Sequence, residues 1–305
     1  MKIKFRVPAT TANLGPGFDV FGAALTLYNE FSAEFVPNAK KTKFILSGHG
    51  KESIPKGKDN LLWKAMSETF NLLGETKYNL KNLNIEISTK IPLNGGLGSS
   101  ATAIVGGISL ANKLCKNKLN KSQIAELAIK IEGHPDNVVP AIFGGLCACA
   151  KNKEALRTTT INLPLPKLKV ILCVPSFEIR TNHSRQIIPK NIPLQDVVFN
   201  ISRVALLTAA FCSNDYSLLK EAMQDKIHQP YRGKMIPAMN KVLEKALNSG
   251  AYGGFLSGSG STLAAFCSKE NSENVKKNML ECWKTENVIA KGFILDFDKA
   301  GATRI

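Results

Sequence analysis

Apolar and polar residues alternate along the start of the chain with the period of two that is typical of a half-buried strand. Residues 2–7 place three basic side chains between three apolar ones, and residues 23–36 are rich in β-branched and aromatic side chains. Residues 83–91 alternate Leu and Ile with polar residues in the same way. These segments predict three strands, and the turn-forming residues 8–19 predict a loop between the first two.

A period near 3.6 replaces this alternation in three other segments of the first half. Residues 59–73 carry an apolar stripe that ends at Gly74, and residues 100–114 combine apolar and small side chains without proline. Residues 124–131 repeat apolar positions at helical spacing, and Gly133 follows as the expected C-terminal cap. Each segment therefore predicts a helix.

The second half predicts the same mixture of strands and helices. Residues 132–150 are expected to form a loop that opens into a buried strand, and the proline-rich residues 163–166 predict a domain boundary. The sequence therefore predicts an α/β protein of two domains, residues 1–164 and 165–305. Further strands are expected at 169–175 and 262–266, helices at 197–211, 217–223, 234–247 and up to Trp283, and a second glycine-serine loop at 253–260.

The composition excludes several classes of protein. With 305 residues, 44% hydrophobic and 21% charged, the chain is an ordinary globular protein, and its net charge of +16 favours anionic ligands. The basic residues form short groups without aromatic neighbours, so we expect a solvated surface and no nucleic-acid partner. No signal peptide and no apolar run near a membrane span is apparent, and seven cysteines in mostly apolar surroundings indicate reduced thiols, which together predict a cytoplasmic protein without a membrane partner.

The sequence PLNGGLGSSATA, residues 92–103, separates a predicted strand from a predicted helix. Glycines let the main chain approach a phosphate closely, and the free N–H groups at a helix N-terminus attract anions. The lysine of the commonest phosphate loop is absent, and the preceding strand alternates, unlike a dinucleotide-binding strand. A phosphate-binding loop is the favoured interpretation, and a simple tight turn is the alternative.

This motif resembles the P-x-x-x-G-L-G-S-S-A signature of the galactokinase, homoserine kinase, mevalonate kinase and phosphomevalonate kinase (GHMP kinase) superfamily. PATTANLGPGFD near the N-terminus and GGFLSGSGSTLAAF near the C-terminus match two further motifs, and EGHPDNVVPAIFGG and IHQPYR are similar to the homoserine kinase branch. The resemblance implies the GHMP kinase fold, with an N-terminal ATP-binding domain like a ribosomal-protein domain and a C-terminal ferredoxin-like α+β domain. It also implies ATP-dependent phosphorylation of the side-chain hydroxyl of L-homoserine, a step of threonine biosynthesis.

The resemblance assigns the ATP site. Asn60 is expected near adenine, and Mg²⁺ is expected on Ser100 and on Glu126, the glutamate eight residues before His134. On a helical wheel Glu126 lies opposite the apolar stripe, which without the family indicates a solvent-facing side chain, and Glu132 is the rival carboxylate. The loop around the phosphates comprises Pro92, Leu93, Asn94, Gly95, Gly96, Leu97, Gly98, Ser99, Ser100, Ala101 and Thr102.

The resemblance also assigns the acceptor site. Asp19 and Asn13 are expected at the ammonium and backbone polar groups of the substrate, and Arg185 and Arg232 at its carboxylate, although surface arginines, or Arg180 in place of Arg185, are alternatives. The groups expected near the reacting hydroxyl are Thr181, His134 and Asn137.

No general base is assigned, because the mevalonate branch has an aspartate where this chain has Asn137, and phosphoryl transfer asks for little early deprotonation. Asp136 could serve as a base but is expected to cap the backbone after Pro135. In the third motif Ser261 stands where the family usually has proline, behind a supporting loop of Gly258, Ser259 and Gly260. A kinase of the same superfamily with another substrate and a non-catalytic ligand-binding member are alternatives, and a homodimer is possible.

Overall fold

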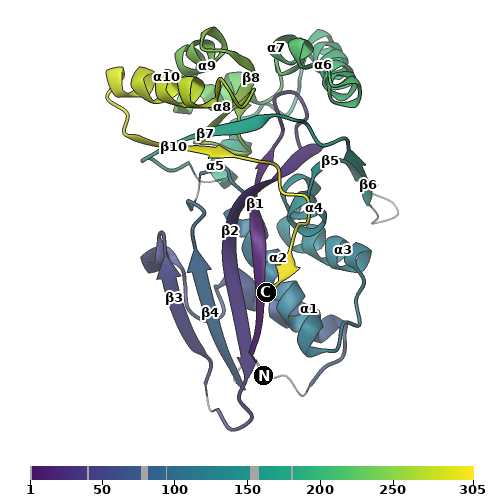
Figure 1. Ribbon diagram of the computed structural model, residues 1–305. Coiled ribbons are helices and arrows are strands. Elements are labelled where there is room, and N and C mark those ends of the chain that lie inside the picture. The colour runs from purple at the N-terminus through teal and green to yellow at the C-terminus, as the bar shows by residue number, and fades with distance from the viewer. Residues whose placement is uncertain (1, 40, 77–81, 94, 152–157, 180) are drawn as a thin grey trace.

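A computed structural model describes residues 2–39, 41–76, 82–93, 95–151, 158–179 and 181–305. Two sheets form the frame of the molecule (Figure 1). The first has seven strands and joins both chain ends, because β11 (Thr303–Arg304) pairs with β1 (Lys2–Ala12). Its other strands are β2 (Phe21–Phe35), β3 (Lys43–Gly48), β4 (Leu83–Thr89), β5 (Leu146–Lys151) and β6 (Thr158–Leu163).

The long strands β1 and β2 are antiparallel members of the first sheet, and one end of the pair extends toward the second sheet. Near one end β2 pairs with β4, and near the other end it pairs with β5, so its neighbour changes along its length. β1 continues to Ala12, past the predicted end at residue 7, and its pairing with β2 shifts register between Pro8 and Ala9. The predicted loop at 8–19 is therefore confined to the few residues between β1 and β2.

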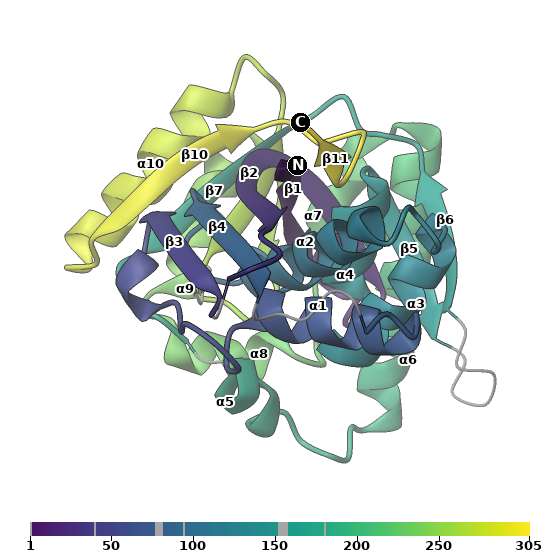
Figure 2. The ribbon, with the colours of Figure 1, turned by 90° about the horizontal axis from the view of Figure 1, so that it is seen from below.

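Helices cover one face of the first sheet (Figure 2): α1 (Leu61–Leu72), α2 (Ser99–Leu114), α3 (Lys121–Glu132) and α4 (Pro135–Phe143). β4 alternates buried and half-buried positions as predicted, because its inward side chains face these helices. The opposite face carries surface ion pairs, such as Lys4 with Glu30 and Lys2 with Glu86.

The predicted loop before β5 is instead the helix α4, and that prediction was wrong. Pro135 occupies the first turn, where its missing N–H costs nothing, and the chain leaves the helix at Gly144 with a φ of 76°. Pro140 lies within the helix. Prolines and the short length hid the helical period in the sequence.

The second sheet has the order β10-β7-β9-β8 and is antiparallel throughout. β7 (Lys169–Pro175) is almost continuously buried because Ile171 and Cys173 face one core while Val170 and Leu172 face another. The other strands are β8 (Ala251–Leu256), β9 (Leu263–Cys267) and β10 (Ala290–Leu295).

Two sets of helices complete the second half. α9 (Met239–Asn248) and α10 (Ser272–Thr285) cover the outer face of the second sheet, where Trp283 is fully buried. α6 (Leu194–Ser213) and α7 (Leu219–Ala222) pack on the other face together with the ends of β1 and β2. The short helix α5 (Thr181–Gln186) lies between the two halves, and α8 (Gln229–Arg232) contacts it, since Arg232 Nε donates to Ser184 O. The predicted helix at 234–247 begins only at Met239, after a single 3-10 turn.

The division predicted at residue 164 falls between β6 and β7. The last residues, however, return to the first sheet, since β11 pairs with β1 and the N–H of Ile305 donates to Lys4 O. The residues after β10 therefore belong to the first sheet, although they follow the second half in the sequence.

Within the described residues, α6 is long and apolar enough to cross a membrane by length and composition alone. Its Leu207, Ala210 and Phe211 are buried in the core that joins the two sheets, and Phe211 packs against Phe266 with ring centroids 6.2 Å apart. Of its most apolar stretch 22% is buried, and a single such helix is weak evidence for a membrane span.

The seven cysteines are free thiols that differ in burial. Burial raises the pKa of Cys147 and Cys173 to about 12 and that of Cys115 to about 11, whereas Cys212 is exposed. Because the thiolate is the reactive form, a disulfide reagent at pH 8 should modify the exposed Cys212 fastest. The half-buried Cys282, whose pKa burial raises, should follow more slowly, and the five buried thiols should react only on unfolding. The Cys212→Ser variant should lack the fast phase, and rapid labelling of several thiols in that variant would contradict this arrangement of cores.

Candidate active site

A cavity of about 370 Å³ lies where the phosphate loop, the start of α1, the α3–α4 junction, the loop before β2 and α5 meet. The sequence-predicted residues that line it are Asn13, Asp19, Asn60, Leu93, Gly95, Gly96, Leu97, Gly98, Ser99, Ser100, His134, Asn137, Thr181, Arg185, Arg232, Gly258 and Ser259. Pro92, Ala101, Thr102 and Gly260 are not among the lining residues, and Asn94 lies outside the described part of the chain. The structure thus brings the predicted donor and acceptor residues to one cavity.

The glycine loop is held from two sides. Leu97 O accepts from Thr10 N of β1 at 3.1 Å, and Gly95 O accepts from Thr262 N at 3.1 Å. Gly96 O accepts from the Ser257 hydroxyl at 2.7 Å. The loop then enters the 16-residue helix α2, whose N-terminus faces the cavity with first-turn N–H groups that have no acceptor within the helix.

Positive φ values at Gly96 (76°) and Gly98 (67°) make the loop turn in a conformation that other residues rarely adopt. A Cβ on Gly98 would lie 1.9 Å from Thr10 Oγ1 and 3.1 Å from Asn137 Oδ1. The loop therefore packs directly on residues of the acceptor end of the cavity.

The carboxylate next to the serines is Glu132 and not Glu126, the residue that the resemblance assigns to Mg²⁺. Ser100 Oγ donates to Glu132 Oε2 at 2.8 Å, and both residues line the cavity. Glu126 is exposed on α3 and does not line the cavity. Glu126 and Glu132 are six positions apart, about one and two-thirds helical turns, so their side chains leave the helix in very different directions. Of the two carboxylates weighed from the sequence, Glu132 is the one that lines the cavity.

Asp136 organises the acceptor end. Its Oδ1 accepts from His134 Nδ1 at 2.5 Å and from Asn137 Nδ2 at 3.3 Å, and Asn137 Oδ1 accepts from Thr10 Oγ1 at 2.8 Å. Asp136 was expected to cap the backbone after Pro135, but its described bonds hold two side chains that face the cavity instead. Burial acts to lower the pKa of His134, but Asp136 and the nearby Glu132 outweigh it and leave that pKa above its usual value.

Asp19 and Arg185 form a two-point ion pair across the cavity. Arg185 Nη2 donates to Asp19 Oδ1 at 2.6 Å and Nη1 to Oδ2 at 3.0 Å. Asn13 fixes the backbone here, because its Oδ1 accepts from Asp19 N and its Nδ2 donates to Gly258 O. Burial acts to raise the pKa of Asp19, but Arg185 and neighbouring cations hold it below its usual value. The residues predicted for the substrate's ammonium and carboxylate are thus paired with each other.

Arg232 is almost fully buried, with 2% of its surface exposed. Its Nε donates to Ser184 O at 3.1 Å and its Nη1 to Gly258 O at 3.0 Å. The guanidinium groups of Arg232 and Arg185 lie 5.1 Å and 5.5 Å from the ring centre of Phe18. Burial and the charge of Arg185 lower the pKa of Arg232 to about 10.

Other predicted residues have structural partners as well as a place in the cavity. Asn60 caps α1 by accepting from Trp63 N at 3.2 Å and donates to Pro55 O at 2.8 Å. Thr181 Oγ1 lies 3.3 Å from Ser259 Oγ. Ser261 is buried and donates to Phe177 O at 2.8 Å, a bond that the usual proline of this motif could not make.

Sequence reasoning missed Thr10 and Phe18, although both lie in the N-terminal motif that it identified. Thr10 was placed in a loop and is in a strand, and Phe18 was given no role of its own. The only indication in the sequence that these residues belong to the site was their position in a motif shared with the family.

Comparison with known proteins identifies the family. The GHMP kinase N-terminal domain family matches residues 60–145 and the GHMP kinase C-terminal family matches residues 207–285. A homoserine kinase of Carboxydothermus hydrogenoformans is 44% identical over 85% of this chain and 83% of its own length. One of Desulfitobacterium hafniense is 39% identical over 99% of this chain and 100% of its own. The chain belongs to the homoserine kinase family.

Solved structures agree on the fold. The crystal structure of a homoserine kinase from Cytophaga hutchinsonii matches with a TM-score of 0.89 and 29% identity over 100% of this chain and 97% of that one. A mevalonate kinase from L. major, in complex with R-mevalonate, has a TM-score of 0.73 at 16% identity and covers 97% of this chain, which shows the shared fold alone. The predicted GHMP kinase fold and ATP-dependent kinase class of this homoserine kinase family member are therefore confirmed.

The contact of Gly98 with Thr10 predicts a strong effect of one methyl group. Gly98→Ala should lower kcat/KM for ATP by at least about tenfold, because Cβ would overlap Thr10 Oγ1 and displace the loop. Gly74→Ala is the matched control: its φ of 63° imposes similar strain, but a Cβ there meets nothing within 4 Å. Steady-state kinetics of both variants separate the effect of backbone strain from that of the overlap with Thr10. Equal losses of kcat/KM in both variants would contradict the role of the contact.

Proposed function

We propose that this protein transfers the γ-phosphoryl group of ATP to the side-chain hydroxyl of L-homoserine and forms O-phospho-L-homoserine, as a step of threonine biosynthesis. The observation that carries the proposal is the Asp19–Arg185 pair beside the buried Arg232, which lies in the same cavity as the glycine loop. High identity to homoserine kinases over most of the chain supports the same conclusion.

The charges of the cavity suit an amino acid. Asp19 offers a carboxylate for an ammonium group, while Arg185 and Arg232 offer planar donors for a carboxylate. A zwitterion that inserts between Asp19 and Arg185 exchanges one ion pair for two without changing the net charge of the cavity. An alcohol without these groups would have to leave the ion pair intact or break it without compensation, which is costly in a partly buried site.

The glycine loop is suited to the phosphates of ATP. Backbone N–H groups at the start of α2 provide positive potential there, in place of the lysine of other phosphate loops. The apolar lining near Ile54, Leu61 and Leu93 is suited to adenine, next to Asn60.

Ser100 and Glu132 would hold Mg²⁺, replacing the pair first expected from the sequence. Both offer oxygen ligands, and their side chains already meet at 2.8 Å. A bound Mg²⁺ neutralises negative charge on the transferred phosphoryl group.

At the acceptor end we propose that Asn137, His134 and Thr181 position the reacting hydroxyl. Asp136 supports them by holding the imidazole of His134 and the amide of Asn137. Because the transition state of phosphoryl transfer is loose, positioning can suffice, and no residue is assigned as a general base.

We expect a cytoplasmic protein that acts on a small molecule and needs no nucleic acid or membrane, and a homodimer is compatible with the proposal. The absence of clustered basic runs in the sequence and the match to homoserine kinases support this expectation.

The substrate assignment predicts a clear order of activities. With ATP and Mg²⁺, the purified protein should phosphorylate L-homoserine with a kcat/KM at least about a hundredfold above that for mevalonate, galactose or L-serine, because only homoserine satisfies both charges at the right distance from its hydroxyl. ADP release across this panel measures the order. Equal or faster turnover of mevalonate would overturn the proposal.

The assignment of Glu132 predicts an asymmetry between two glutamates. Glu132→Gln should lower kcat by at least about a hundredfold and raise the Mg²⁺ concentration needed for half-maximal rate, because a neutral amide is a weaker metal ligand. Glu126→Gln, the same change on the exposed face of α3, should stay within about twofold of the parent protein. The reverse order in a magnesium titration would restore Glu126 as the ligand.

A further inference from the structure

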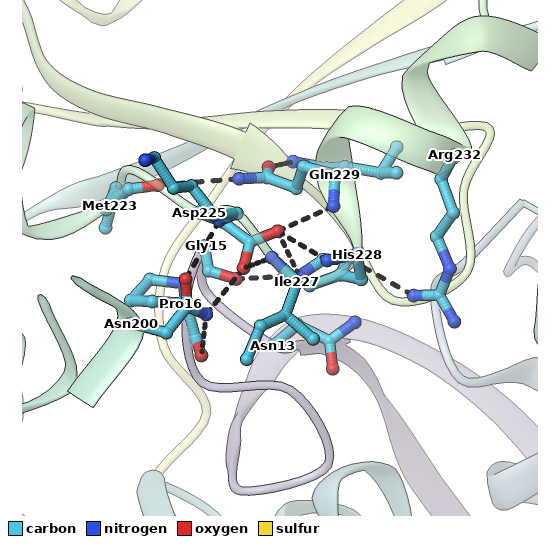
Figure 3. A network of polar contacts seen from close by, with 12 residues as sticks. Asn13, Gly15, Pro16, Asn200, Met223, Asp225, Ile227, His228, Gln229 and Arg232 are labelled. Carbon is cyan, nitrogen blue, oxygen red and sulfur yellow. Dashed lines mark hydrogen bonds and ion pairs between the residues drawn. The ribbon is translucent and has the colours of Figure 1, made fainter. Parts of the chain in front are cut away.

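A fully buried carboxylate, Asp225, lies directly before α8 and accepts four hydrogen bonds (Figure 3). Its Oδ1 accepts from Asn200 Nδ2 at 2.7 Å and Ile227 N at 3.0 Å, and its Oδ2 accepts from His228 N at 2.9 Å and Gln229 N at 2.6 Å. Four donors, three of them backbone N–H groups, thus converge on one buried carboxylate. Asp225 therefore fixes the backbone from which His228 and α8 start.

His228 continues this network toward the cavity. Its side chain is fully buried, and its Nε2 lies 2.7 Å from Gly15 O, an acceptor, so Nε2 carries the proton. Nδ1 is then the acceptor for Arg232 Nη1 at 3.3 Å. Burial lowers the pKa of His228, which agrees with a neutral ring next to an arginine.

These contacts orient Arg232. With Ser184 O, Gly258 O and His228 Nδ1 as acceptors, three of its five N–H groups are used on Nε and Nη1. Among the bonds of the described residues this leaves the two N–H groups of Nη2 for a ligand in the cavity that Arg232 lines.

The same network fixes the loop that carries the other substrate groups. His228 binds Gly15 O, and its ring stacks on Phe18 with centroids 5.3 Å apart. Gly15 lies so close to Met223 that a Cβ would approach Met223 O to 2.4 Å. Asn13 and Asp19 flank these contacts on the same loop.

We propose that Asp225 and His228 are positioning residues for recognition of the substrate carboxylate: they hold Arg232 and the loop of residues 13–19 in one arrangement, so that the cation and Asp19 face the two charged groups of the amino acid together. This inference rests on the function proposed above and adds residues to it. Neither side chain lines the cavity, so their effect on the substrate has to pass through Arg232 and the loop.

The test compares L-homoserine with 3-amino-1-propanol, which lacks only the carboxylate. His228→Phe keeps a ring that can stack on Phe18 but removes the acceptor for Arg232 and the donor to Gly15. The variant should raise KM for L-homoserine by about tenfold while KM for ATP stays within about twofold, because one hydrogen bond to a charged group is worth about that factor. Its rate with 3-amino-1-propanol should change little, so the preference for the carboxylate shrinks.

Conservative variants separate positioning from folding. His228→Asn places an amide oxygen near the position of Nδ1 and should recover part of the preference for the carboxylate. Asp225→Asn should lose preference as His228→Phe does, and Asp196→Asn, the same change at a surface ion pair with Lys226, should leave both substrates unaffected. Thermal unfolding of each variant reports whether it is folded.

The outcomes are distinct. Equal losses on both substrates in a folded His228→Phe variant, or an unchanged preference, would overturn the positioning role while leaving the proposed function intact. If His228→Phe does not fold, the His228→Asn and Asp225→Asn variants decide by the same comparison. Failure of the parent protein to phosphorylate L-homoserine would instead refute the proposed function, and the inference would fall with it.

Discussion

The charge of Arg232 is buried where the two sheets meet, and much of the site depends on how that charge is accommodated. A guanidinium removed from water is stable only when its donors find acceptors. Here the acceptors come from α5, from the loop after β8 and from His228, which lie far apart along the chain. Packing these segments around one cation also places Phe18 and the loop of residues 13–19. The arginine thus organises the scaffold besides facing the ligand.

One residue near the end of β1, Thr10, contacts both the phosphate end and the acceptor end of the cavity. The backbone of Thr10 binds the glycine loop through Leu97 O, and its hydroxyl binds Asn137. Thr10 thus connects the glycine loop to Asn137, and its position is fixed by the pairing of β1 with β2. The distance between a bound phosphate and an acceptor hydroxyl is therefore set by rigid strand and helix backbone, which suits a reaction that relies on positioning.

Local pattern and motif identity predicted the fold class, most helices, β7 to the residue and the set of loops that meet at the site. Features that depend on contacts between distant segments were not predictable. The helical wheel indicated that Glu126 faces solvent, as it does, but the contact of Glu132 with Ser100 depends on where α3 lies relative to α2 and could not be predicted. α4 was hidden by its prolines, and the roles of Asp225 and His228 arise from bonds to Gly15 and Arg232 that no periodicity encodes.

The return of the last ten residues to the first sheet affects how the chain can be made. Asp298 accepts from Tyr28 Oη and from the N–H groups of Ala300 and Gly301, and Ile305 donates to Lys4 O. Until these residues leave the ribosome, β1 has an open edge and the N-terminal half lacks part of its frame. The first sheet is therefore completed last, after the second sheet has been synthesised, and a shortened C-terminus would expose the very strand whose end carries Thr10.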